Sequence, residues 1–346
     1  MDRCRGRVPG LVLRGKEFGT GAVSCESTPP RPWGASAPPY TWRVKLLASV
    51  PRDARSGPHR TRLGLLKPDG IHDLTDATGL HDVGELLASG RTINEVDAGE
   101  LIDPDTVTLR APLPRPGKVI CVGLNYHDHC REQGIEPPPY PPLFAKFANA
   151  IASPGDAITR PRATEKLDLE CELAVVIGRR ASRVGRDEAL AHVFGYTILN
   201  DITMRDLQRE DHRWLRAKGS DGFAPIGPAV VTADELPDTG SLRMRSSVNG
   251  ETWQDSSTAE MIFDVATIIA FVSRTITLEP GDLIATGTPA GVGHFQRPPR
   301  YLADGDRLRC EIEGIGALEN SIADELPRAD DHATAAGVAE LMELAR

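Results

Sequence analysis

The sequence has no long apolar run and no clustered cysteines. No stretch of about 18 apolar residues occurs, so we expect no transmembrane helix. The six cysteines form no Cys-x-x-Cys pair, which favours reduced and partly buried thiols in a cytoplasmic protein. No apolar segment follows the arginines near the start of the chain, and this disfavours a secretory signal.

Basic residues are also in deficit. The 346 residues include 40 lysines and arginines against 49 aspartates and glutamates, which gives a formal charge of -9 at pH 7. Nucleic acid selects for a basic patch, so we expect no nucleic-acid partner, and we expect no membrane partner either. The chain is 40% hydrophobic, which is enough for a sizeable core.

Composition and turn signals divide the chain into segments. The start is rich in glycine and proline and holds no periodic pattern, which predicts disorder; an arginine-rich transit peptide is the alternative. Prolines at positions 112, 114 and 116 form a stiff connector that is typical of a domain boundary. The predicted segments are a disordered tail (1–41), a small β-rich domain (42–112), a catalytic domain (117–328) and a C-terminal helix (329–346).

One run combines carboxylates with the pattern of a buried strand. It spans Leu167–Gly178, and its second half is rich in valine and isoleucine. Its first half has Asp168, Glu170 and Glu172 at alternate positions, so a continuous strand puts all three on one face. Such carboxylates repel one another and are costly to desolvate, and a hard divalent cation relieves both costs. The alternative is a solvated strand face that carries acids.

An imidazole and a carboxylate follow another predicted strand, Lys118–Val122. If the next residues are helical, His129 and Glu132 lie three positions apart on one face. A carboxylate that contacts an imidazole orients it and raises its basicity, so such a pair can activate water. The alternatives are a surface helix with a chance pair, and a zinc site with His127, for which further ligands are not evident.

Later segments add single candidates. The buried strand predicted at residues 143–147 holds one inward or edge lysine, Lys146. Another predicted strand ends on Asp201, which is either a third carboxylate ligand or a helix N-cap. Arg205 and Gln208 follow it, and a guanidinium suits a substrate carboxylate. Lys218 lies in a glycine-bounded loop and by itself is expected to be solvated.

These motifs form an ordered set over roughly residues 118–323. The set consists of Gly123-Leu124-Asn125-Tyr126 with His129 and Glu132, Asp168 to Leu173, Asn200-Asp201 with Arg205 to Gln208, Lys218, Gly227-Pro228, Asn249-Gly250-Glu251, Pro280-Gly281-Asp282 and Thr286-Gly287-Thr288-Pro289. Each motif alone is weak, but the ordered set resembles the fumarylacetoacetate hydrolase family.

The resemblance implies an α+β, mainly β fold with a mixed β-sandwich or β-roll core, peripheral helices and a small N-terminal β-rich domain. It also implies a homodimer and a bound Mg²⁺ or Mn²⁺. By match to the family motifs, the metal ligands are Glu170, Glu172 and Asp201. The catalytic residues are His129, Glu132 and Lys218, and the substrate-binding residues are Asn125, Tyr126, Arg205, Gln208 and Thr288. His127 departs from the family pattern, which expects a small residue there.

The implied substrates are 2-oxo acids, in which a chelated metal acts as a Lewis acid and stabilises an enolate. We expect hydrolysis of a C–C bond in an acylpyruvate-like or fumarylpyruvate-like diketo acid. The second expectation is an isomerase or decarboxylase of a 2-hydroxy-diene-dioate, such as 2-hydroxyhepta-2,4-diene-1,7-dioate, in aromatic catabolism. The third, a catalytically silent binding protein on the same fold, conflicts with the complete set of ligands and the His/Glu pair.

Overall fold

Strands dominate the part of the chain that the structure describes. The structure is a computed structural model that describes residues 45–52, 60–91, 99–211 and 214–326. The strands are β1 (Lys45–Pro51), β2 (Arg62–Lys67), β3 (Gly70–Asp73), β4 (Leu101–Ile102), β5 (Val107–Arg110), β6 (Val119–Val122), β7 (Leu143–Lys146), β8 (Ile151–Ala152), β9 (Ala157–Arg160), β10 (Leu167–Asp168), β11 (Cys171–Ile177), β12 (Val193–Asn200), β13 (Thr203–Met204), β14 (Ala224–Thr232), β15 (Arg243–Val248), β16 (Glu251–Ser257), β17 (Leu283–Ala285), β18 (Arg307–Ile312) and β19 (Gly316–Asp324). The α-helices are α1 (Thr75–Thr78), α2 (Val83–Ser89), α3 (His127–Gln133), α4 (Arg186–Ala189), α5 (Arg205–Glu210), α6 (Leu215–Lys218) and α7 (Val265–Ser273). The mainly β fold class predicted from the sequence is confirmed.

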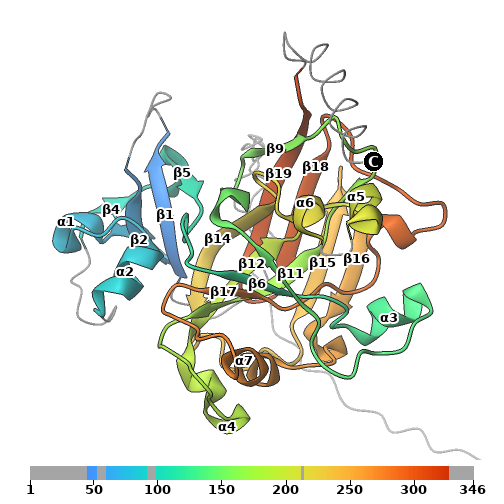
Figure 1. The fold of residues 1–346 in the computed structure, drawn as a ribbon. Coiled ribbons are helices and arrows are strands. Elements are labelled where there is room, and N and C mark those ends of the chain that lie inside the picture. The colour runs from blue at the N-terminus through green and yellow to red at the C-terminus, as the bar shows by residue number, and fades with distance from the viewer. Residues whose placement is uncertain (1–44, 53–59, 92–98, 212–213, 327–346) are drawn as a thin grey trace, which may run out of the picture. The chain divides into compact units, whose positions relative to one another are not determined.

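Two mixed sheets organise these strands (Figure 1). The larger has 12 strands, in the order β4-β3-β2-β1-β14-β12-β11-β17-β6-β7, with β5 paired to β1 and β8 paired to β14. The smaller has five strands, in the order β16-β15-β18-β19-β9. A separate two-stranded ribbon joins β10 to β13.

The central strand β11 is buried on both faces. Leu173, Val175 and Ile177 belong to a hydrophobic cluster that also contains residues of β15, β18 and α7. Ala174 and Val176 belong to a second cluster with residues of α2 and β14. Because successive side chains of a strand point to opposite faces, a strand covered on both faces must be apolar throughout. This explains the uninterrupted apolar run that the sequence shows here.

The acidic run is not one continuous strand. β10 ends at Asp168 and pairs with β13, whereas β11 begins at Cys171 and pairs with β12. Leu169 and Glu170 lie between them, outside regular structure. The prediction that Asp168, Glu170 and Glu172 lie on a single continuous strand is therefore wrong, since only Glu172 lies within β11.

The predicted small N-terminal domain shares its sheet with the rest of the chain. β1 pairs antiparallel with β14, with Lys45 opposite Val231 and Leu46 opposite Val230. The described residues accordingly form one compact unit. The proline connector thus separates two segments of sequence but not two sheets.

A cap and a tight turn set two element boundaries. Helix α7 begins at Val265, because Asp264 caps it by accepting the Thr267 N–H at 2.8 Å. Pro68 and Asp69 form the turn that joins β2 to β3 as an antiparallel hairpin. The predicted tail at 1–41 and helix at 329–346 lie outside the described residues.

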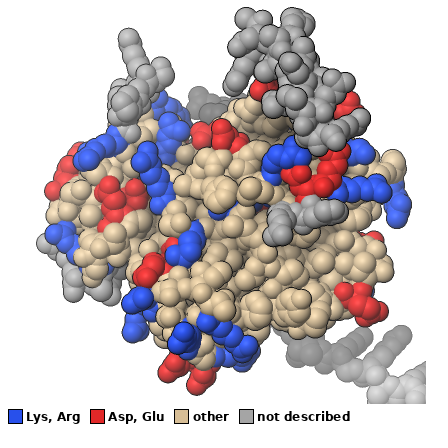
Figure 2. Space-filling model, in the orientation of Figure 1, with Lys and Arg blue, Asp and Glu red and all other residues tan. Residues whose placement is uncertain are grey.

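The surface carries both signs of charge. On the face shown in Figure 2, basic and acidic side chains of the described residues are interspersed around a broad uncharged area. Within the described ranges, no helix has the length and apolar character needed to cross a membrane.

A substitution at Gly195 on β12 tests how closely β12 and β14 are packed. A Cβ at this position would lie 2.2 Å from the carbonyl oxygen of Val231 on β14, so Gly195→Ala must push two paired strands apart. We expect a loss of about 1–3 kcal/mol in the free energy of unfolding, measured by chemical denaturation. Gly240→Ala, in an exposed loop, is the control and should change stability little. Equal stability of the two variants would contradict the packing of β12 against β14.

Candidate metal centre and catalytic site

Three carboxylates meet beside the paired strands β11 and β12. Glu170 directly precedes β11, Glu172 lies within it, and Asp201 directly follows β12. The strand register pairs Cys171 with Asn200, and Asn200 Oδ1 accepts the N–H of Glu170 at 3.1 Å. One carboxylate oxygen from each of the three acids lies within 4.8 Å of the other two, and all three acids are buried. The predicted ligand trio is thus assembled by strand pairing.

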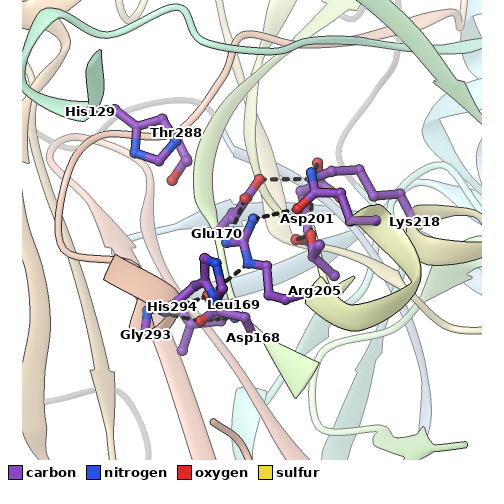
Figure 3. Close-up of polar contacts among 12 residues, drawn as sticks. His129, Asp168, Leu169, Glu170, Asp201, Arg205, Lys218, Thr288, Gly293 and His294 are labelled. Atoms are coloured by element: carbon purple, nitrogen blue, oxygen red, sulfur yellow. Dashed lines mark hydrogen bonds and ion pairs between the residues drawn. The ribbon is translucent and has the colours of Figure 1, made fainter. Parts of the chain in front are cut away.

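Basic side chains surround these acids (Figure 3). Lys218, the last residue of α6, donates to Glu170 Oε2 at 2.9 Å and to Asp201 Oδ2 at 2.6 Å. Arg205 Nη2 lies 2.7 Å from Glu170 Oε1. Lys146 Nζ lies 2.7 Å from Asp201 Oδ1. Lys218 is therefore buried in ion pairs, and the expectation of a solvated side chain is wrong.

Burial and neighbouring charges shift the pKa values of Glu170 and Glu172 in opposite directions. Burial alone would raise the pKa of Glu170, but the charges of Lys218 and Arg205 outweigh it and lower this pKa to about 2. Burial raises the pKa of Glu172 well above its ordinary value, and the negative charges of Asp201 and Glu170 raise it further. Burial disfavours the charged form of Lys218, yet Asp201 and Glu170 hold its pKa above the ordinary value. Lys218 is consequently a permanent cation and not a base at neutral pH.

The donor set fits a hard divalent cation. Glu172 makes no ion pair with a described residue, and its Oε2 accepts only the Gly287 N–H, at 2.8 Å, among the hydrogen bonds within the described chain. Asp201 Oδ1 is buried and accepts no directed hydrogen bond, although Lys146 lies beside it. Both carboxylates therefore keep oxygen lone pairs for a ligand. Carboxylate oxygens are the ligands that Mg²⁺ and Mn²⁺ prefer.

Asp168 connects this centre to a turn of the chain that lies beside the His/Glu pair. Its Oδ2 accepts Arg205 Nε and the His294 N–H, each at 2.9 Å. Its Oδ1 accepts the N–H groups of Leu169 and Gly293, each at 2.9 Å. Asp168 is fully buried, so these four donors satisfy a charge that would otherwise be costly. It orients Arg205 and is not one of the three grouped ligands.

His129 and Glu132 form the predicted pair on α3. His129 Nδ1 and Glu132 Oε1 are 2.6 Å apart, and Glu132 Oε2 accepts the Gly291 N–H at 2.9 Å. The ring of Phe295 packs edge-on against the imidazole, with centroids 5.8 Å apart. Because Nδ1 faces Glu132, Nε2 is the nitrogen left for a substrate. In Figure 3 His129 lies apart from the ion pairs.

Two predicted substrate-binding residues are instead held inside the protein. Asn125 Nδ2 donates to the carbonyl oxygens of Phe263 at 3.0 Å and Thr286 at 2.7 Å, and its Oδ1 accepts the Phe263 N–H at 2.8 Å. The hydroxyl of Tyr126 donates to Met244 Sδ at 3.1 Å. Both side chains are fully buried. Both side chains hold the turn before α3 in place, and their contact with a substrate stays a prediction.

The other three predicted substrate-binding residues lie at the site but already have protein partners. Arg205 Nη1 donates to Gln208 Oε1 at 3.0 Å, so these two side chains act as a pair. The hydroxyl of Thr288 donates to the Cys171 carbonyl at 3.1 Å and accepts Gln254 Nε2 at 2.7 Å. Their contact with a substrate remains a prediction.

A comparison with models of protein families shows which family the chain belongs to. Residues 118–323, more than half of the chain, match the fumarylacetoacetate (FAA) hydrolase C-terminal family model. The chain belongs to the fumarylacetoacetate hydrolase family.

Relatives within this family have several activities. A mitochondrial oxaloacetate tautomerase of Bos taurus is 47% identical over 218 residues, which cover 62% of this chain and 69% of that protein. The solved fumarylacetoacetate hydrolase from Exiguobacterium antarcticum is 41% identical and has a TM-score of 0.72, covering 82% of this chain and 100% of that one. A 2-hydroxyhepta-2,4-diene-1,7-dioate isomerase from Mycobacterium marinum is 32% identical, with a TM-score of 0.66 and coverage of 82% and 100%. The chain is thus similar to hydrolases, isomerases and tautomerases of one family.

Two residues at this family site had no role in the sequence reasoning. Lys146 was visible as a single lysine within an apolar strand, which signals a buried partner but does not name it. Gln254, on β16, accepts the Cys171 N–H at 3.0 Å and donates to Thr288. No local pattern distinguishes this glutamine, because its partners are far away in sequence.

The raised pKa of Glu172 predicts a pH-dependent effect of metal on stability. Without metal, the folded protein retains a proton on Glu172 that the unfolded chain loses above its ordinary pKa of 4.5, so stability should fall as pH rises from there. A metal needs the ionised carboxylate, so Mn²⁺ should raise Tm more at about pH 8 than at about pH 5.5. Thermal unfolding with EDTA or Mn²⁺ measures this. Glu172→Gln should flatten both trends, and an equal Mn²⁺ effect at the two pH values would contradict the assignment.

Proposed function

We propose that this protein is a metal-dependent enzyme that interconverts the keto and enol forms of a 2-oxo dicarboxylic acid related to oxaloacetate. The observation that carries the proposal is the His129–Glu132 pair, together with a carboxylate trio that suits a divalent cation. Enolisation needs a base near the carbon that loses its proton and positive charge near the oxygen that becomes negative. The arrangement supplies residues for both tasks.

Glu170, Glu172 and Asp201 would hold the cation. When bound, such a cation supplies Lewis acidity and an anchor for the carboxylate and 2-oxo groups of a substrate. The charge of the site supports an acidic substrate. Four buried carboxylates, including Asp168, face three cations, so a divalent ion would leave an excess of positive charge.

His129 would move the proton. Its Nδ1 faces Glu132, which favours the tautomer with the proton on Nδ1 and an unprotonated Nε2 as the base. Glu132 stabilises the imidazolium that forms when Nε2 accepts a proton, and the Gly291 N–H keeps this carboxylate in position. Returning the proton to oxygen or carbon completes the interconversion. Lys218, as a fixed cation, stabilises negative charge and leaves the proton to His129.

Hydrolysis of a C–C bond is the second candidate. The same imidazole can take a proton from water, and the similar protein from Exiguobacterium antarcticum is named a fumarylacetoacetate hydrolase. Both candidates share the step in which negative charge develops on the 2-oxo oxygen. They differ in whether water enters the product.

The expected homodimer and cytoplasmic location remain predictions.

Product identification separates these candidates. Purified protein, treated with EDTA and then supplied with Mg²⁺ or Mn²⁺, is incubated with the enol form of oxaloacetate and, separately, with an acylpyruvate. We expect faster loss of enol absorbance than without protein, with oxaloacetate recovered intact by NMR. Cleavage of the acylpyruvate without effect on oxaloacetate would favour the hydrolase. Full activity in excess EDTA would refute metal dependence.

Replacing His129 tests the proton transfer. We expect His129→Ala to lower kcat by about 10²–10⁴-fold, because the base is lost while the metal ligands are intact. His127→Ala is the matched control, since His127 is exposed on the same helix. Steady-state rates on the substrate identified above measure both variants. A wild-type kcat in His129→Ala would remove the pair from the mechanism.

A further inference from the structure

Lys146 is a buried cation that the proposed reaction does not use. It is the last residue of β7, at one edge of the large sheet, and its side chain is fully buried. Its ammonium contacts Asp201 Oδ1 at 2.7 Å and the Phe223 carbonyl at 2.7 Å. It also donates to the carbonyl oxygens of Lys218 and, at 3.4 Å, of Ile202. One side chain therefore ties together the segments that carry Asp201 and Lys218.

The carbonyls take the protons of this ammonium. A lysine has three N–H donors, and three backbone carbonyls lie within reach. Asp201 Oδ1 correspondingly accepts no directed hydrogen bond, although it lies against the charge. Lys146 thus holds Asp201 Oδ1 in place through a 2.7 Å ion pair, and the second lone pair of this oxygen stays available to a metal.

The strand supports Lys218 through a second residue. Phe144 lies two positions before Lys146, so both side chains point to the same face of β7. The Lys218 ammonium lies 5.0 Å from the centre of the Phe144 ring, in a cation–π contact. Trp214, just before α6, packs edge-on against the same ring at 5.4 Å. β7 therefore contacts Lys218 at both its side chain and its backbone.

We propose that Lys146 is a positioning residue that fixes Asp201 and so favours Mg²⁺ over larger cations at the centre. The inference rests on the metal centre proposed above. Mg²⁺ demands near-ideal octahedral geometry, whereas Ca²⁺ accepts longer and more variable ligand distances. Rigid ligands therefore favour Mg²⁺, and a loosened Asp201 penalises Mg²⁺ more than Ca²⁺.

A purely electrostatic role makes the opposite prediction. Lys146 adds positive charge beside the centre, and like charge opposes the binding of any cation. If charge were its whole effect, Lys146→Met would tighten Mg²⁺ and Ca²⁺ together and leave their ratio unchanged. Lys146→Arg would keep the charge and bind both metals as the wild type does. The ratio of the Mg²⁺ affinity to the Ca²⁺ affinity thus distinguishes a positioning role of Lys146 from a purely electrostatic one.

Calorimetric titration of EDTA-treated protein with Mg²⁺ and with Ca²⁺ tests the proposal. We expect Lys146→Met and Lys146→Arg to weaken Mg²⁺ binding by about 10–100-fold, as changes around metal ligands do, and to weaken Ca²⁺ binding less. Arginine fails because its planar guanidinium cannot reproduce the contacts of a compact ammonium. Lys118→Met is the control: it removes the 2.7 Å pair with buried Asp282, outside the site, and should leave the ratio unchanged.

The outcomes are distinguishable. An unchanged Mg²⁺-to-Ca²⁺ ratio in both Lys146 variants would overturn the positioning role while leaving the metal centre intact. Wild-type protein that binds neither ion would overturn the metal centre and the role of Lys146 with it. Circular dichroism checks that each variant is folded. If Lys146→Met does not fold, the ratio in Lys146→Arg decides.

Discussion

Buried negative charge is the constraint on which the rest of this structure depends. Asp168, Glu170, Glu172 and Asp201 are all buried, and unpaired carboxylates in such surroundings are very costly. Cationic side chains from three separate elements, β7, α5 and α6, form ion pairs with particular carboxylate oxygens. The pairing is incomplete at Glu172, where burial and like charge raise the pKa. A site that leaves one acid without a cation is ready to accept one.

The carboxylates and the imidazole of the site come from different kinds of element. Strand pairing sets the acids, since β11 and β12 share an antiparallel register and both are buried. The imidazole comes from a short helix, α3, held by a backbone N–H from the chain that follows β17. Asp168 links the two parts, because its carboxylate accepts hydrogen bonds from Arg205 and from the backbone N–H groups beside Phe295. These hydrogen bonds connect the carboxylate centre to the segment that packs against His129.

Sequence reasoning predicted the contributors to the site better than their contacts. The spacing of Glu170 and Glu172, the strand end at Asp201 and the His129–Glu132 interval are local patterns, so they were readable. The buried partners of Lys146 and Asn125 come from remote segments, which no local pattern identifies. The same limit explains the errors over Asp168 and Lys218. A continuous strand and a solvated loop were reasonable locally, but Asp168 and Lys218 pair with residues that are remote in sequence.

The pairing of β1 with β14 gives the N-terminal segment a protective task. All nine residues of β14 are buried, and β1 covers one of its edges. An uncovered apolar strand edge offers free N–H and carbonyl groups to any other extended chain. If the chain were cleaved at the proline connector and the preceding strands were lost, β14 would become an exposed edge strand with unpaired backbone groups. The N-terminal strands thus cover an edge of β14 that would otherwise be open to pairing with another chain.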